Sequence, residues 1–432
     1  MKLSSESTRL STGAIAALLL AMPAWGLSLR DAAQLALQND PRLSAAGSAV
    51  QAAAAGVDAA SAGYKPNASF GAGVAYQRYG FQTTPMPGFP LPSTLLPVSA
   101  SLKATQTLYS GGLVSSQVAS SREQLEGARQ NRDVTRQSLI LEAVTAYLDV
   151  VRDRDVLQLE AANVETLKQA QGDTQKRFDA GAATRTDTAQ AAARLAEAQA
   201  NQKRAQTAVA ASEAAFLRVV GAAAPEGLSA DWPNPPVPAS LAAALGEIDA
   251  SPAVQAADAR QRAARDDIDA ARSGYRPTLA LSGQAMEQND SEFGLDSYHT
   301  WKVQLQANVP IYQGGAVDAK VSQARAGADQ AAAEAVDARR AAAENVTQAW
   351  SALQAADEVI HAYEAAVAAN QMALDNTRKE LAVGTRTTLD LLDAERDSVA
   401  AQVNLTASRR DRAVAAYDLL AACGTLQLDD VH

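Results

Sequence analysis

The chain has 432 residues, a formal net charge of −10 and a pI of about 5.0. This balance argues against a nucleic-acid-binding protein, because such proteins usually present a basic face. Hydrophobic residues make up 47% of the chain, but aromatic residues only 5%, and many of the hydrophobic residues are alanines. Alanine is the best helix former and buries little area, so the composition predicts long, closely packed helices.

The N-terminus has the three parts of a secretory signal peptide. Lys2 and Arg9 supply positive charge, residues 13–24 are apolar, and the small residues Ala24 and Gly26 suit a signal-peptidase site. We therefore expect cleavage after Gly26. The alternative is a membrane anchor, but the apolar run is shorter than the roughly 20 residues that a spanning helix needs. No cysteine follows this run, which argues against a lipid anchor on a processed N-terminal cysteine.

The mature sequence contains two copies of one pattern. Pro41 and the motif GYKP at 63–66 recur 211 positions later, as Pro252 and GYRP at 274–277. The motif Tyr-x-Gly-Gly at 109–112 recurs at 312–315, with an offset of 203. Three further pairs share that second offset: Gly181 and Gly384, Thr184 and Thr387, Asp187 and Asp390. The offset changes between the two motifs, which predicts an exposed loop that is longer in the first half.

Each half predicts the same order of elements. A helix over 30–63 or 240–273 stops at the GY-x-P motif, because proline ends a helical run. Two strands with alternating apolar and polar residues follow, and the pattern is clearest from Trp301 to Ile311. A long helix, a glycine turn and a returning helix complete each half. The predicted strands are 68–79, 98–109, 278–287 and 299–311, and the predicted long helices are 113–177 and 316–380.

These elements divide the chain into five segments. We predict a signal peptide at 1–26, a first repeat at 27–221, a proline-rich linker at 222–239, a second repeat at 240–424 and a C-terminal tail at 425–432. Each long helix would span about 90 Å. Helices of this length indicate a coiled coil or a bundle rather than a compact globule.

The predicted strands have the length of strands that cross an outer membrane, about 9–11 residues. An open sheet leaves backbone groups unpaired in lipid, so four such strands must close into a barrel with other chains. For any single strand, a soluble antiparallel sheet packed on helices is the alternative. The combination of a signal peptide, four amphipathic strands and very long helices favours the membrane.

This order of motifs, given twice, resembles the TolC-like outer membrane efflux protein family over essentially the whole mature chain. The most specific part is GTRTTLDLLDA at 384–394, with a counterpart at 181–187. The resemblance implies a mostly α fold with a transmembrane β-barrel, in which a homotrimer forms twelve strands and a periplasmic helical tunnel. It also implies an outer-membrane exit duct of a tripartite efflux or type I secretion system. The missing lipid-anchor cysteine and the C-terminal sequence favour the type I secretion branch.

The same resemblance implies the partners. They are a periplasmic adaptor (a membrane fusion protein), an inner-membrane pump of the ABC or RND type, and outer-membrane lipid. The alternative is an exported structural coiled-coil or stalk protein without channel activity. A stalk, however, has no need for four amphipathic strands placed between its helices.

The resemblance assigns roles to residues near the two glycine turns. Asp390 and Asp393 share one helix face and would narrow the periplasmic mouth, where three protomers would supply six carboxylates. The alternative for Asp390 is helix capping, with Thr387 as the N-cap. Arg386 would contact Asp187 and hold the helix ends shut, and its alternative is a solvated turn residue. A tyrosine that the family often has before the second turn is Leu381 here.

Two further sets of residues receive roles. The turns at Gly181, Thr184, Gly384 and Thr387 would face the adaptor. The polar strand residues that would line the lumen are Ser99, Ser101, Lys103, Lys302, Gln304 and Gln306.

The sequence carries no catalytic motif such as a P-loop, G-x-S-x-G or H-E-x-x-H. Its three histidines lie far apart, and the single cysteine, Cys423, has no partner pattern for a disulfide or a metal. We therefore expect no enzyme activity, no cofactor and no metal.

Overall fold

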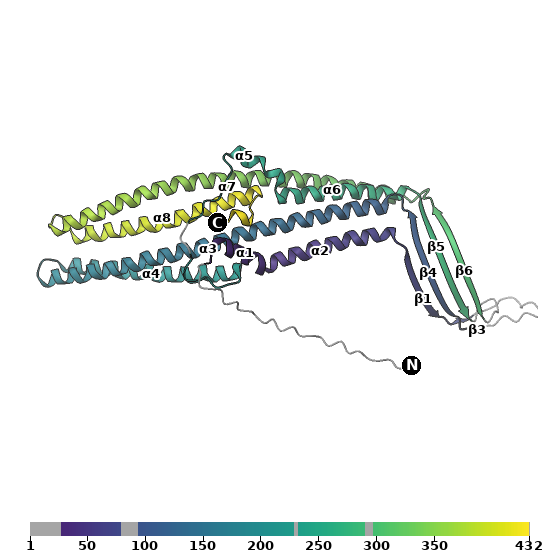
Figure 1. Ribbon diagram of the computed structural model, residues 1–432, viewed down its shortest axis with the longest axis horizontal. Helices are drawn as coiled ribbons and strands as arrows, with labels where there is room; N and C mark the ends of the chain where they lie inside the picture. Colours follow the sequence, from purple (N-terminus) through teal and green to yellow (C-terminus); the bar gives the residue numbers. More distant parts are fainter. Residues whose placement is uncertain (1–26, 79–93, 229–231, 290–296, 432) are drawn as a thin grey trace, which may run out of the picture.

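The computed structural model describes residues 27–78, 94–228, 232–289 and 297–431. It is an elongated helical body with a small β-sheet at one end and two helical hairpin tips at the other (Figure 1). The predicted signal peptide at 1–26 lies outside the described residues. Among the described residues, no helix combines the length and the apolarity that crossing a membrane would require.

Two helical hairpins form the tips. The first consists of α3 (Leu113–Asp179) and α4 (Arg185–Val220), and the second of α7 (Ala316–Ala382) and α8 (Thr388–Cys423). Helices α3 and α7 run from the sheet to the tips, and α4 and α8 return from the tips to the middle of the molecule (Figure 1). The helices α3 and α7 have 67 residues each, which corresponds to about 100 Å. The predicted long helices are thus confirmed, and each extends two residues further than expected.

Small buried residues recur every seven positions along these helices. On α4 they are Ala191, Ala198, Ala205 and Ser212, and on α7 they are Val321, Ala328, Ala335, Ala342 and Ala349. A seven-residue repeat keeps one seam of a helix against its neighbour and is typical of left-handed coiled-coil packing. Alanine at these positions lets the paired helices approach closely.

The helices predicted over 30–63 and 240–273 are each interrupted, so this prediction is wrong. The first is α1 (Leu29–Asn39) followed by α2 (Pro41–Ser61). The second is α5 (Leu241–Gly246), a 3-10 turn and α6 (Pro252–Arg272). Asp40 and Ser251, the residues before the two prolines, are extended, and each proline is the first residue of the next helix.

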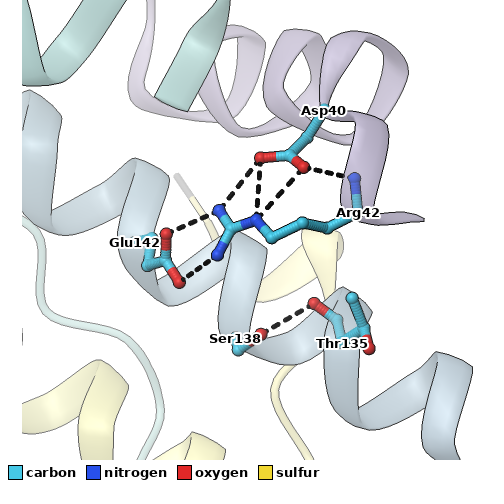
Figure 2. Close-up of polar contacts among 5 residues, drawn as sticks. All are labelled: Asp40, Arg42, Thr135, Ser138 and Glu142. Carbon is cyan, nitrogen blue, oxygen red and sulfur yellow. Dashed lines mark hydrogen bonds and ion pairs between the residues drawn. The ribbon is translucent and has the colours of Figure 1, made fainter. Parts of the chain in front are cut away.

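The corner between α1 and α2 is fastened to α3 by Arg42 (Figure 2). Asp40 caps α2 by accepting from the backbone N–H of Arg42 at 2.7 Å, and its carboxylate also faces the Arg42 guanidinium. The same guanidinium binds both oxygens of Glu142 on α3, at 2.9 and 2.7 Å. The Arg42 hydrogen bonds hold the pKa of the Asp40 carboxyl below its usual range.

The main hydrophobic core lies at mid-length, where α1 and the C-terminal tail meet the two hairpins. Tyr147, Phe216 and Tyr417 are fully or almost fully buried there, with Leu426 and Val431 of the tail. The tail is also tied to α1 by an ion pair between Arg30 and Asp429. The sheet end and the hairpin tips therefore extend in opposite directions from this central core.

The sheet has four antiparallel strands in the order β1-β4-β5-β6. They are β1 (Asn67–Val74), β4 (Val98–Tyr109), β5 (Thr278–Asn289) and β6 (Ser297–Asn308), with a short separate pair, β2 (Gln77–Arg78) and β3 (Thr94–Leu95). All four predicted strands are present. Two end earlier than expected, at Val74 and Asn308. Pro97 lies on the strand across from the first of these ends and Pro310 two residues after the second, and neither proline can donate an N–H to a ladder.

Candidate functional site

The two hairpin tips are built in the same way. Gly181 and Gly384 have φ angles of +74° and +78°, a left-handed conformation that side chains rarely adopt. The residue after each glycine donates its N–H back to the helix, from Ala182 to Arg177 O at 2.7 Å and from Thr385 to Glu380 O at 3.0 Å. Each glycine thus ends one helix in a Schellman turn and lets the chain reverse within a few residues.

Both returning helices begin with a capping box. On α8, Thr387 Oγ1 accepts from Asp390 N at 3.2 Å, and Thr387 N donates to Asp390 Oδ2 at 2.8 Å. Thr184 and Asp187 repeat this arrangement on α4 with the same distances. These hydrogen bonds to the charged carboxylates lower the pKa of both Asp390 and Asp187. The capping role considered for Asp390 is therefore present, and both carboxylates are ionised at neutral pH.

Asp393 links the two hairpins. Its Oδ1 accepts from Arg194 Nη2 of α4 at 2.7 Å, and Arg396 Nη1 lies 3.7 Å from the same oxygen. The Asp393 side chain is 40% exposed, so the carboxylate is paired and still reaches solvent. Sequence reasoning missed Arg194, although it lies seven residues after Asp187 and thus on the same face of α4.

The structure does not bring Arg386 and Asp187 together within the protomer. Arg386 Nε donates to Glu380 Oε2 of its own hairpin at 2.9 Å, while Asp187 caps α4. Their predicted contact would have to form between protomers or in another state, and it stays a prediction. Within the protomer, the ion pair between Arg194 and Asp393 joins the hairpins near their tips.

A buried acid lies beside this link. Glu395 is 5% exposed, its Oε1 faces Arg378 at 3.5 Å, and its Oε2 has no hydrogen-bond partner. Burial raises the pKa of the Glu395 carboxyl, and Arg378 offsets this effect only in part. The tip therefore combines exposed, ionised carboxylates with one desolvated carboxylate.

The strand register places the predicted lumen residues on one face of the sheet. Lys103 faces Gln284, and Gln284 faces Lys302, so both lysines lie in one row across the sheet. Strand alternation then puts the other polar positions on the same face. The residues that share it on β4 and β6 are Ser99, Ser101, Lys103, Lys302, Gln304 and Gln306.

The opposite face of the sheet is apolar and uncovered. Phe70 faces Leu102, which faces Ala285, which in turn faces Trp301. Exposed fractions reach 72% for Phe70 and 82% for Trp301, and Val303 and Leu305 are also exposed. A large exposed apolar patch marks a surface that contacts lipid or another protein.

No group of three or more histidine, cysteine or acidic side chains that could hold a metal occurs in the described parts of the chain. Cys423 is buried against α5, and this burial raises the pKa of its thiol to about 11.

Comparisons with known proteins agree with this architecture. The chain matches the outer membrane efflux protein family over residues 32–222 and 247–425. It is 32% identical over 333 residues to the outer membrane efflux protein BepC of Brucella suis biovar 1, covering 76% of this chain and 73% of BepC. It is 28% identical over 424 residues to the outer membrane protein TolC of Vibrio cholerae serotype O1, covering 95% and 94%. A crystal structure of CusC superposes with a TM-score of 0.81 at 19% identity, covering 94% of this chain and 95% of CusC.

Long helical hairpins joined to an amphipathic four-stranded sheet define the class of TolC-like outer-membrane channels. This chain belongs to the outer membrane efflux protein family. It is an outer-membrane exit duct whose helices form the periplasmic part.

Proposed function

We propose that three copies of this chain join their sheets into one twelve-stranded barrel, continued by a tunnel of helices. The observation that carries the proposal is the sheet itself. Its edge strands β1 and β6 each pair on one side only within the described part of the chain. A sheet that is apolar on one face and polar on the other can sit in lipid only if these edges are closed.

The polar face would line the lumen of this barrel, and the apolar face with Phe70 and Trp301 would meet lipid. A stalk protein offers no reason for such an exposed apolar face. The duct would conduct solutes passively from the pump.

At the other end, Asp390 and Asp393 of three protomers would form the periplasmic constriction. Both carboxylates lie in the first two turns of α8, and the pKa of Asp390 is lowered, so the ring would carry negative charge at neutral pH. Such a ring favours cations and binds divalent cations. The pairs of Arg194 with Asp393 and of Arg386 with Glu380 would restrain the helix ends while the duct is closed.

The glycine turns at both tips would be the surface that meets a periplasmic adaptor. Through the adaptor, the duct would serve an inner-membrane pump of the ABC or RND type. Relatives of this chain include an efflux protein, BepC, which supports export as the task.

The constriction is tested by replacing Asp390 and Asp393 with asparagine in the full-length trimer. Asparagine keeps an oxygen that can accept the capping hydrogen bonds, so the change removes charge and preserves the helix start. Single-channel conductance should rise, and block by millimolar divalent cations should weaken by about tenfold or more.

A matched control replaces Asp173 and Asp375, two exposed acids of α3 and α7, with asparagine. It removes the same charge and should leave block unchanged. If conductance and block are unchanged in the variant of Asp390 and Asp393, these two residues do not line the constriction.

A further inference from the structure

The two returning helices begin with the same capping box, but their charges differ one turn later. At the repeat offset of 203, Asp393 of α8 corresponds to Gln190 of α4. At the same offset, Asp397 of α8 corresponds to Arg194 of α4, so an acid in one half is a cation in the other. The start of α8 is therefore more acidic than the start of α4, and the cation of α4 lies against it.

The guanidinium of Arg194 lies between two carboxylates. Its Nη2 donates to Asp393 Oδ1 at 2.7 Å, and its Nη1 donates to Glu197 Oε2 of its own helix at 3.1 Å. Asp393 is both the nearer and the less exposed of these acids, with 40% of its side chain exposed against 56% for Glu197. Because Arg194 itself is only 26% exposed, water and salt screen the pair with Asp393 less than they screen a fully exposed pair.

The second cation beside Asp393 is already engaged by another acid. Arg396 Nη1 lies 3.7 Å from Asp393 Oδ1, whereas its Nη2 lies 2.8 Å from Asp397 Oδ1. The charges of Arg396 and Asp397 thus largely balance each other. Arg194 is the remaining cation that offsets the charge of Asp393.

A small polar cavity beside the ion pair allows the guanidinium to be removed without disturbing the packing. The cavity has a volume of about 40 Å³ and lies where α3, α4 and α8 meet. Its lining includes Asn163, Arg194, Asn201 and Arg396. A polar cavity of this size has room for water, which can hydrogen-bond to the groups that a shorter side chain releases.

The charge balance at Asp393 matters because of the ring that three protomers would form. Asp390 and Asp393 would supply six carboxylates around one axis, and their mutual repulsion grows as the ring narrows. Three copies of Arg194, each paired with Asp393, would offset half of this charge. The helix ends could then lie close together without a bound cation.

We propose that Arg194 sets the charge of the periplasmic constriction. By pairing with Asp393, it leaves Asp390 as the main unbalanced acid, and it makes the ring a weaker binder of divalent cations than six free carboxylates would be. This inference rests on the constriction proposed above. It adds to that constriction a residue that determines ion specificity, which is a different role from restraining the helix ends.

The two roles predict opposite effects of Arg194→Gln in the full-length trimer. Loss of three positive charges beside the ring should lower the Mg²⁺ concentration that halves the current in a planar bilayer by about fivefold or more. The reversal potential in a KCl gradient should shift toward higher cation selectivity. If Arg194 only restrained the helix ends, its loss would widen the ring, and a wider ring would need the same or a higher Mg²⁺ concentration.

Companion variants separate charge from shape. Arg194→Gln combined with Asp393→Asn removes one charge of each sign and should return the blocking concentration close to that of the unmodified protein. Arg194→Lys keeps the charge and should preserve block. The control is Arg204→Gln, which removes an exposed arginine ten residues further along α4 and should leave block unchanged.

The outcomes distinguish this inference from the constriction on which it rests. All variants are compared as trimers, verified by light scattering. If Arg194→Gln does not tighten block while the variant of Asp390 and Asp393 loses it, Arg194 does not set the charge and the constriction stands. If Mg²⁺ fails to block even the unmodified trimer, the proposed constriction is wrong and the role of Arg194 is wrong with it.

Discussion

Lys103 and Lys302 determine the charge of the polar sheet face. They lie in one row of the register, and the other polar-face residues on β4 and β6 that we assign to the lumen are uncharged. Three protomers would place six ammonium groups in the barrel, far from the carboxylates at the hairpin tips. A duct with an acidic entrance and a basic exit would select ions at two places.

This arrangement predicts the effect of removing the lysines. Lys103→Gln with Lys302→Gln should make the open duct more cation-selective, which a reversal potential in a KCl gradient would measure. The control, Lys203→Gln with Lys320→Gln, removes equal charge from exposed helix positions and should leave the potential unchanged. If both double variants behave alike, the two sheet lysines do not line the conducting path.

Glu395 predicts a pH dependence of stability. Burial raises the pKa of its carboxyl above the usual value of 4.5, so the folded state disfavours the charged form. Its contribution to stability is fully present below pH 4.5 and falls as the pH rises through the higher pKa of the folded state. Glu395→Gln should therefore raise the melting temperature at pH 7 and leave it unchanged at pH 4. A loss of stability at pH 7 would show that the pair with Arg378 outweighs desolvation.

At the residue scale, local chemistry could be predicted and distant partners could not. The spacing of Thr387 and Asp390 predicts a capping box, and the structure contains it. The partner of Asp393 is Arg194, which lies 199 positions away on the other hairpin. Only the packing of α4 beside α8 brings these residues together, and no local pattern encodes that packing.

At the scale of elements, the seven-residue seams of small residues hold the hairpins together. Ala198 is 2% exposed within such a seam, while Ala200 on the same helix is exposed. Ala198→Leu should lower the free energy of unfolding by about 1–3 kcal/mol, because a larger side chain forces the paired helices apart. Chemical denaturation followed by circular dichroism would measure this, and Ala200→Leu should change little. Equal losses of stability for Ala198→Leu and Ala200→Leu would show that Ala198 does not lie in a tightly packed seam.

The sequence predicts the long helices and the strands because their periodicities persist over many residues. It fails at boundaries that depend on single residues. Pro41 and Pro252 divide helices that their alanine-rich sequences predict as continuous, and Pro97 and Pro310 lie where ladders stop. Prolines at such positions favour a boundary, because they lack the N–H that helices and ladders use and keep the preceding residue extended.

At the scale of the whole molecule, a single chain leaves several surfaces without a packing partner. Across the residues that the structure describes, it presents two unpaired sheet edges, an uncovered apolar face and a helix, α2, without a buried residue. The trimer proposed above would cover these surfaces with neighbouring copies of the chain. Closure of three such chains would convert all of these exposed surfaces into a barrel and a tunnel.

The most direct test of this account is the conductance of the purified, detergent-extracted protein in a planar lipid bilayer. We expect trimers that insert and give small, steady, cation-selective openings, because the proposed constriction would narrow the duct and carry negative charge. If the protein is recovered in the soluble fraction without detergent, does not insert into the bilayer and carries no current, the account is wrong.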